Sequence, residues 1–133
     1  MLIVENYKIQ NYSDQMTDEE LYGFCVMNRD LRIERDQDQN IIIMSPVSAV
    51  AGFCEAELIT DVGIWTKRTK KGLTFSSATG FILPNGAMRS PDACWVSTKN
   101  WQTVTDKEKF LRLVPEFVVE VRSPSDNLKP LKE

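Results

Sequence analysis

A chain of 133 residues is long enough for one folded domain and too short for two of ordinary size. Its hydrophobic content of 42% and charged content of 26% are typical of a soluble globular protein, and a net charge of −3 disfavours a dedicated nucleic-acid binder. The chain contains no histidine, which excludes Ser-His-Asp and Cys-His catalysis and histidine-ligated zinc or iron. Any chemistry must therefore rest on carboxylates, lysines, arginines or hydroxyl groups.

The cysteines and the N-terminus indicate no special compartment. Cys25, Cys54 and Cys94 are far apart and form no Cys-x-x-Cys pair, so neither a zinc site nor a disulfide framework is expected. Residues 1–15 lack the basic start and long apolar stretch of a signal peptide, and no apolar run approaches the roughly 20 residues of a membrane span. We therefore expect a cytoplasmic protein.

The first elements along the chain are a short helix and a β-hairpin. Thr17 followed three residues later by Glu20 is a capping-box pattern, and it predicts an amphipathic helix over 18–28. The segments Leu31–Arg35 and Ile41–Met44 are separated by the turn-prone DQDQN, which predicts a hairpin.

A longer helix is predicted over about 48–70. Ser48 is a suitable N-cap, apolar residues recur near a period of 3.6, and cations in the last turn are followed by Gly72. The basic run Lys67, Arg68, Lys70 and Lys71 is either a solvated helix end that complements the helix dipole or a surface that attracts a phosphate backbone.

The second half of the chain predicts short strands, at 73–77, 80–83, 87–89 and 93–96. Asn85-Gly86 indicates a tight turn, because this pair accepts positive φ at both central turn positions. Residues 98–112 are polar and compatible with a helix. A further strand with the sequence FVVEV follows Pro115.

Glu120 is the unusual residue of that last strand. Its neighbours are β-branched and aromatic at a density typical of a strand buried on both faces. An ionised carboxylate there is costly unless a cation, a proton or several donors meet it. The alternative is that Glu120 faces solvent at the edge of a sheet.

Asp92 is placed similarly, since it follows Pro91 at the start of the apolar strand ACWV. Strand, connection, strand is an order that brings Asp92 and Glu120 side by side in one sheet. Two close carboxylates stay ionised when a cation lies between them, and oxygen-only ligation points to Mg²⁺ or Mn²⁺. The competing interpretation is that Pro-Asp is a common turn element.

Pro91-Asp92 and Glu120-Val121-Arg122 look like the signature of the PD-(D/E)XK nuclease superfamily. Three longer blocks, RIERDQDQNIIIMSP, SSATGFILPNGAMRSPDACWVS and PEFVVEVRSPSDNL, together resemble the Uma-two family of restriction-endonuclease-like proteins, which is abundant in cyanobacteria. The resemblance covers nearly all of the chain from Thr17 onward. It implies an α/β (α+β) fold in one domain over 1–133, with a mixed sheet flanked by helices and with an N-terminal helix and hairpin.

The resemblance also assigns roles to the acids. Asp92 and Glu120 match the metal-binding acids of the family, and the Val121 carbonyl is a further candidate ligand. Glu34, in the IERD stretch, matches a glutamate that recurs ahead of the MSP segment. Glu57 on the long helix is the alternative to Glu34 as a further ligand, although the favoured interpretation of Glu57 is a solvent-facing helix residue.

The chain departs from the superfamily pattern at one position. Two residues after the glutamate, where the superfamily has a lysine, this chain has Arg122. An arginine stabilises negative charge but does not act as a general base, because it stays protonated. The family carries a lysine on the following helix instead, and this chain offers Lys129 and Lys132 there. We expect the domain to lack its C-terminal helix and strands, because residues 127–133 read as a helix that stops one turn in.

These expectations favour a Mg²⁺- or Mn²⁺-dependent DNA endonuclease without sequence specificity. In this enzyme Arg122 or Lys132 would stabilise the negative charge that develops on the phosphate, and the basic run of the long helix would contact the DNA backbone. The alternative is a catalytically inactive nuclease-fold protein. Such a protein would act as an interaction or dimerisation module through an uncovered sheet, for example as a homodimer.

Overall fold

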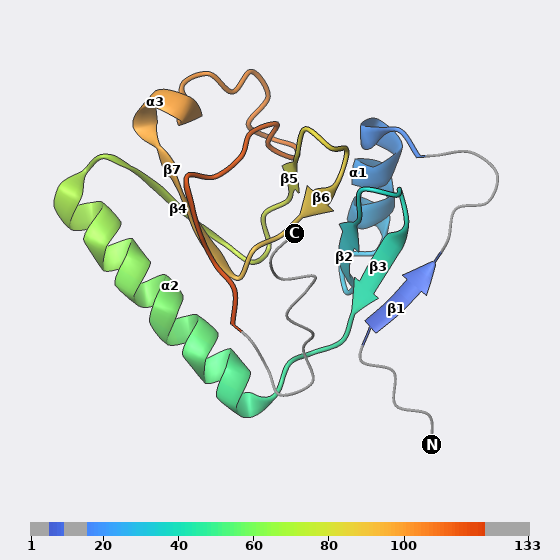
Figure 1. Cartoon of the computed structure of the whole chain (residues 1–133), viewed down its shortest axis with the longest axis horizontal. Helices are drawn as coiled ribbons and strands as arrows, with labels where there is room; N and C mark the ends of the chain where they lie inside the picture. The colour runs from blue at the N-terminus through green and yellow to red at the C-terminus, as the bar shows by residue number, and fades with distance from the viewer. Residues whose placement is uncertain (1–5, 10–15, 122–133) are drawn as a thin grey trace. The chain divides into compact units, whose positions relative to one another are not determined.

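The structure is a computed structural model in which residues 6–9 and 16–121 are described (Figure 1). Helices and antiparallel strands confirm the expected α+β class. The chain divides into two compact units. The first unit comprises Met1–Pro46, Ala78–Ser90 and Val104–Val114, and the second comprises Val47–Ser77, Pro91–Thr103 and Pro115–Glu133.

The first unit is built on a five-stranded sheet in the order β1-β3-β2-β6-β5. The predicted hairpin is confirmed, and Ile33 faces Ile43 in its register. A parallel bridge also joins Phe81 to Leu111. The strands of this sheet are β1 (Asn6–Ile9), β2 (Arg32–Arg35), β3 (Ile41–Met44), β5 (Phe81–Ile82) and β6 (Met88–Arg89).

Helix α1 (Asp18–Met27) closes the core of the first unit. The Thr17 hydroxyl accepts a hydrogen bond from the Glu20 backbone N–H at 3.1 Å, so the predicted cap is present. Burial of apolar side chains from the helix and the sheet is the main stabilising contribution here. The buried members of this core are Leu21, Ile33, Ile41, Ile82 and Met88.

The β5–β6 turn differs from the expected one. Gly86 alone of the Asn-Gly pair has positive φ, at 87°. The Gly86 N–H donates to the Leu83 carbonyl at 2.9 Å, and the Ala87 N–H donates to Asn85 Oδ1 at 3.0 Å. The central turn residues are therefore Pro84 and Asn85, because the proline ring already fixes the φ that the first central position needs.

The second unit pairs a long helix with a three-stranded sheet in the order β4-β7-β8. Helix α2 (Ala49–Thr69) runs beside strands β4 (Gly72–Ser76) and β7 (Ala93–Ser97) (Figure 1). The Ser48 hydroxyl accepts from the Ala51 N–H at 3.2 Å, which confirms the predicted N-cap. Thr66 Oγ1 on the helix lies 2.6 Å from Thr74 Oγ1 on β4, so a hydroxyl pair fixes the helix against the sheet.

The C-terminal end of α2 shows why a glycine follows it. Lys70 itself takes the left-handed conformation, with φ 55°, and its N–H donates to the Thr66 carbonyl. Gly72 has another role: a Cβ there would lie 2.5 Å from the Trp95 indole, so the glycine permits the close packing of that ring. The expected cap residue is thus displaced by two positions.

Two predictions are wrong: the extent of one helix and the burial of the last strand. The helix over 98–112 is reduced to α3 (Thr98–Trp101), because Leu111 instead bonds with its backbone to Gly80 and Ile82 at 3.0 and 2.8 Å. Strand β8 (Phe117–Val119) is not buried on both faces. It lies at the edge of its sheet among the described strands, and Phe117 and Val118 are 52% and 48% exposed.

A buried arginine joins the elements of the first unit. Arg35 is only 2% exposed, and its guanidinium lies 2.6 Å from Asp18 Oδ1. It also donates to the Gly86 and Met16 carbonyls at 3.1 Å each. Arg112 contacts the other Asp18 oxygen at 2.6 Å. Burial by itself raises the pKa of Asp18, but the hydrogen bonds from Arg35 and Arg112 outweigh it and hold that pKa below 3.8.

We expect Asp18→Asn to lower the free energy of unfolding at neutral pH by about 2 kcal/mol, because it leaves the buried Arg35 charge uncompensated. A depressed carboxyl pKa contributes stability above its unfolded value, and this stability is lost as the pH falls through the folded pKa. The difference between the two proteins should therefore shrink below pH 3.8. Urea unfolding measured across the acid range checks this. The exposed-site control Asp30→Asn should change stability by less than about 0.5 kcal/mol, and an equal loss in both variants would contradict the role of Asp18.

Candidate metal and phosphodiester site

Asp92 directly precedes β7, and Glu120 directly follows β8 in the second unit. Strands β7 and β8 are antiparallel, and their outermost pair on this side is Ala93 with Val119. If the register is extended by one position, Asp92 faces Glu120, and facing positions of a strand pair direct their side chains to the same face of the sheet. The expectation that these two acids are neighbours is compatible with this register and stays a prediction.

A backbone contact links the two segments at this point. The Val121 N–H donates a hydrogen bond of 2.6 Å to Asp92 Oδ2. Asp92 is 7% exposed, whereas Glu120 is an exposed residue that directly follows β8. The Asp92 carboxylate is thus held by the main chain of the segment that carries Glu120.

The thiol of Cys94 is close enough to Glu120 to be affected by its negative charge. The residue is fully buried on β7, two positions after Asp92, and alternation along the strand places it on the same face as the two acids. Burial, reinforced by the negative charge of Glu120, raises the pKa of the Cys94 thiol to about 12. The thiol therefore stays protonated at neutral pH, which disfavours it as a nucleophile.

Glu34 is engaged inside the first unit. Its Oε2 lies 3.0 Å from the Arg89 guanidinium, and its Oε1 accepts the Ser90 N–H at 3.3 Å. Glu57 is exposed on α2. Within residues 16–121 no group of three or more Cys, Asp and Glu side chains is arranged to hold a metal ion. The assignment of Glu34 or Glu57 as a further ligand therefore stays a prediction.

The remaining candidates divide into two sets. Arg122, Lys129 and Lys132 lie outside the described residues, so their predicted roles are not tested. The four cations at the end of α2 are all exposed, as a nucleic-acid contact requires and as a solvated helix end would equally show: Lys67, Arg68, Lys70 and Lys71.

Two features of the second unit were not predicted from the sequence. One is the hydrogen bond from the Val121 N–H to Asp92, because only the Val121 carbonyl was expected to take part in the site. A register prediction for β7 and β8 would have found this hydrogen bond. The other is an apolar cavity of about 410 Å³ beside α2, in which Trp65 and Trp95 meet. Trp65 belongs to the helix period and Trp95 to the strand alternation, but only the packed structure brings the two rings together.

Comparison with known proteins identifies the family. Residues 18–133 match the sequence model of the Uma2 (Uma-two) family, whose description is "Putative restriction endonuclease". The chain belongs to the Uma2 family. Uma2 membership confirms the resemblance noted in the sequence, and the matched range includes Asp92, Glu120 and Val121. No curated protein matches the chain. None of the helices within the described part of this Uma2 chain has the length and apolar character needed to cross a membrane.

We expect Glu120→Gln to lower the pKa of Cys94, because the substitution removes the negative charge that adds to the effect of burial. The titration of the cysteine Cβ signals, followed by carbon-13 NMR, measures this directly. Glu57→Gln removes the same charge from an exposed position on α2 and is the matched control. An identical Cys94 titration in the Glu120→Gln variant and the unmodified protein would show that Glu120 does not lie near this face.

Proposed function

We propose that this protein is a metal-dependent DNA endonuclease that hydrolyses phosphodiester bonds in the cytoplasm. The observation that carries the proposal is the hydrogen bond from the Val121 N–H to Asp92, at the end of a β7–β8 register whose extension by one position pairs Asp92 with Glu120. Membership of a family described as "Putative restriction endonuclease" supports the reaction class and DNA as the substrate. The proposed metal dependence rests on the chemistry of the two carboxylates.

The donor set fits a hard divalent cation. Two carboxylates and a backbone carbonyl offer only oxygen ligands, which Mg²⁺ and Mn²⁺ prefer, and Mg²⁺ commonly binds through one or two carboxylates while substrate phosphate and water complete its coordination. Asp92, Glu120 and the Val121 carbonyl would hold the ion. When bound, such an ion activates water and neutralises charge on the attacked phosphate.

Main-chain and side-chain groups of this protein have different roles in the proposed reaction. The Val121 N–H donates to Asp92 Oδ2 and thereby orients the Asp92 carboxylate. The exposed position of Glu120 lets a bulky backbone phosphate approach. Arg122 or Lys132 supplies positive charge to the oxygens of the phosphate as negative charge develops. Arg122 does not remove a proton from water, because its guanidinium stays protonated.

The end of α2 offers contacts to the DNA backbone. Its four exposed cations can contact backbone phosphates, and such contacts contribute affinity without sequence specificity. Cleavage at many sequences is therefore part of the proposal.

A second candidate function is favoured by one observation. The described edge strand β8 exposes Phe117 and Val118 on opposite faces, and an edge strand with apolar side chains is suited to pairing with another chain. In this alternative the fold is a catalytically inactive interaction module that forms a homodimer. Sedimentation equilibrium distinguishes it, because a monomer at micromolar concentration would remove its basis.

We expect the protein to nick supercoiled plasmid DNA when Mg²⁺ or Mn²⁺ is present, and we expect Asp92→Asn and Glu120→Gln each to reduce the rate by about 100-fold or more, because each variant loses one charged ligand. Agarose-gel conversion of supercoiled to open-circular DNA measures the rate. Asp30→Asn and Glu108→Gln, at exposed positions of the first unit, are the matched controls and should nick at the unmodified rate.

Two outcomes would contradict the proposal. Equal nicking by all five proteins would mean that the activity comes from a contaminant. Calorimetric titration with Mn²⁺ gives a readout besides activity: heat of binding that is unchanged in Glu120→Gln would remove the proposed ligand role of Glu120.

We expect Arg68→Gln to weaken binding of double-stranded DNA and to reduce the slope of log affinity against log salt by about one, as the loss of a single phosphate contact requires. Fluorescence anisotropy of a labelled duplex in Ca²⁺, which limits cleavage, over a range of NaCl measures both quantities. Arg29→Gln, an exposed arginine of the first unit, is the control. Equal slopes for Arg68→Gln and the unmodified protein would mean that Arg68 does not contact the DNA backbone and is a solvated residue of the helix end.

A further inference from the structure

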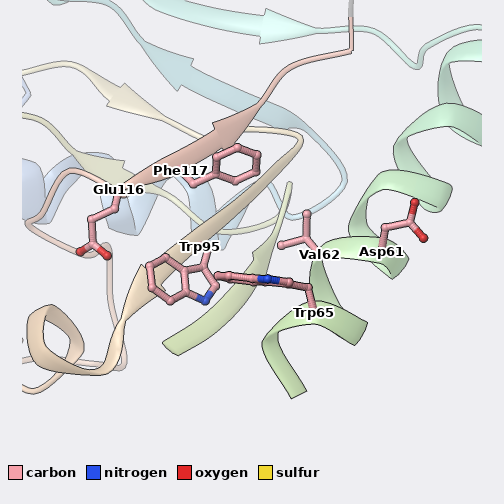
Figure 2. Close-up of a pocket in the computed structure, with 6 residues that line it drawn as sticks. All are labelled: Asp61, Val62, Trp65, Trp95, Glu116 and Phe117. Carbon is pink, nitrogen blue, oxygen red and sulfur yellow. The ribbon is translucent and has the colours of Figure 1, made fainter. Parts of the chain in front are cut away.

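We propose that the aromatic pocket of the second unit binds the guanidinium group of an arginine side chain presented by a partner protein. The pocket is lined by Trp65 and Val62 of α2, by Trp95 of β7 and Phe117 of β8, and by Asp61 and Glu116 (Figure 2). It is separate from the proposed nuclease site and does not depend on it, because Trp95 and Phe117 face the opposite side of the sheet from Asp92 and Glu120.

Three aromatic rings provide the recognition surface. Trp95 and Phe117 are a directly facing pair in the β7–β8 register, so both side chains leave the same face of the sheet, and both line the pocket. The Trp65 ring meets Trp95 edge to face, with centroids 5.4 Å apart and planes at 67°. Trp65 is 48% exposed and Phe117 is 52% exposed, although each is large and apolar. Aromatic faces that are left open to solvent in this way are a favourable surface for a flat organic cation.

The charges beside the pocket select the sign of its ligand. Asp61 and Glu116 stand at opposite ends of the aromatic row in Figure 2. The Glu116 carboxylate is fixed by donors at the junction of β7 and α3: the Ser97 N–H and hydroxyl donate to it at 2.8 and 3.1 Å, and the Asn100 amide also donates to it. Two carboxylates repel the phosphates of a nucleic acid and attract a cation, so the charge argues for a basic protein segment.

Arginine fits this combination better than lysine does. Its guanidinium is planar, stacks on aromatic faces, and loses less hydration than an ammonium group when it enters an apolar site. A cavity of about 410 Å³ accommodates the whole side chain with room for its flanking backbone. Buried arginines beside tryptophans are also the residues that contribute most to protein–protein affinity.

The test uses NMR of the full chain with nitrogen-15 label and follows the three tryptophan indole N–H signals. The probe is a short glycine-flanked peptide with a single arginine. We expect it to shift the signals of Trp65 and Trp95 in a saturable manner. Trp101 is an internal control, since it packs against Phe75, 5.6 Å away, whose position in the register places it on the other face of the sheet.

Two test variants, one control variant and one matched peptide decide the outcome. Asp61→Asn and Phe117→Ala should each weaken binding by about fivefold, as the loss of one charge or one ring predicts. Asp38→Asn, an exposed acid of the β2–β3 turn, should bind as the unmodified protein does. Asp61 is exposed on α2, so its replacement tests the proposal even if Phe117→Ala alters the edge strand.

The proposal is overturned by any of three results. A peptide with citrulline in place of arginine could bind equally well, which would mean that the charge is irrelevant. The indole signal of Trp101 could shift together with the other two, which would indicate non-specific association. A single-stranded oligonucleotide could shift Trp65 and Trp95 while the arginine peptide does not, which would make the pocket a base-stacking site.

Discussion

The pairing of β7 with β8 is the constraint on which the second unit depends. Only three residue pairs define it, from Ala93 with Val119 to Trp95 with Phe117. Because side chains alternate along a strand, this register decides which residues share a face, and a slip by one residue would exchange every one of them. The backbone bond from Val121 to Asp92 lies one step beyond the last pair and helps to fix the register where the two acids meet.

The same register gives the sheet two faces of different character. One face carries the acids together with the buried Cys94, whose raised pKa reflects both burial and the nearby Glu120 charge. The other face carries Trp95 and Phe117 and packs against α2 through Trp65 and the Thr66–Thr74 hydroxyl pair. The proposed hydrolytic site and the proposed recognition surface can share this three-residue edge strand, because they use alternate side chains.

The first unit follows a different principle, in which a buried charge organises the polar contacts. Arg35 reaches from β2 to Asp18 at the start of α1, to the Met16 carbonyl and to the β5–β6 turn at Gly86. Apolar packing of the Leu21 and Ile33 cluster would permit many arrangements of these segments, since it has little directionality. A guanidinium has donors in a fixed geometry, so its partners restrict the arrangement that the core can take.

Short sequence patterns were sufficient to predict the helix caps, the turn of the hairpin and several strands. Capping and turn formation involve residues within a few positions of one another, so short patterns predict them. Examples are the caps at Thr17 and Ser48, the hairpin of β2 and β3, and the start of β7 after Pro91-Asp92. The types and the separation of Asp92 and Glu120 were likewise enough to identify them as candidates. The β-rich composition of FVVEV predicted a strand correctly.

The tertiary structure decided how those elements are used. The apolar FVVEV pattern does not distinguish a central from an edge strand, because the same residues suit both and only the number of neighbouring strands differs. The polar stretch over 98–112 is compatible with a helix, yet Leu111 forms its bonds with Gly80 and Ile82 instead, and such a distant competitor leaves no local signal. Trp65 and Trp95 are 30 positions apart, and no local pattern places their rings in contact; the packing of α2 on the sheet does so.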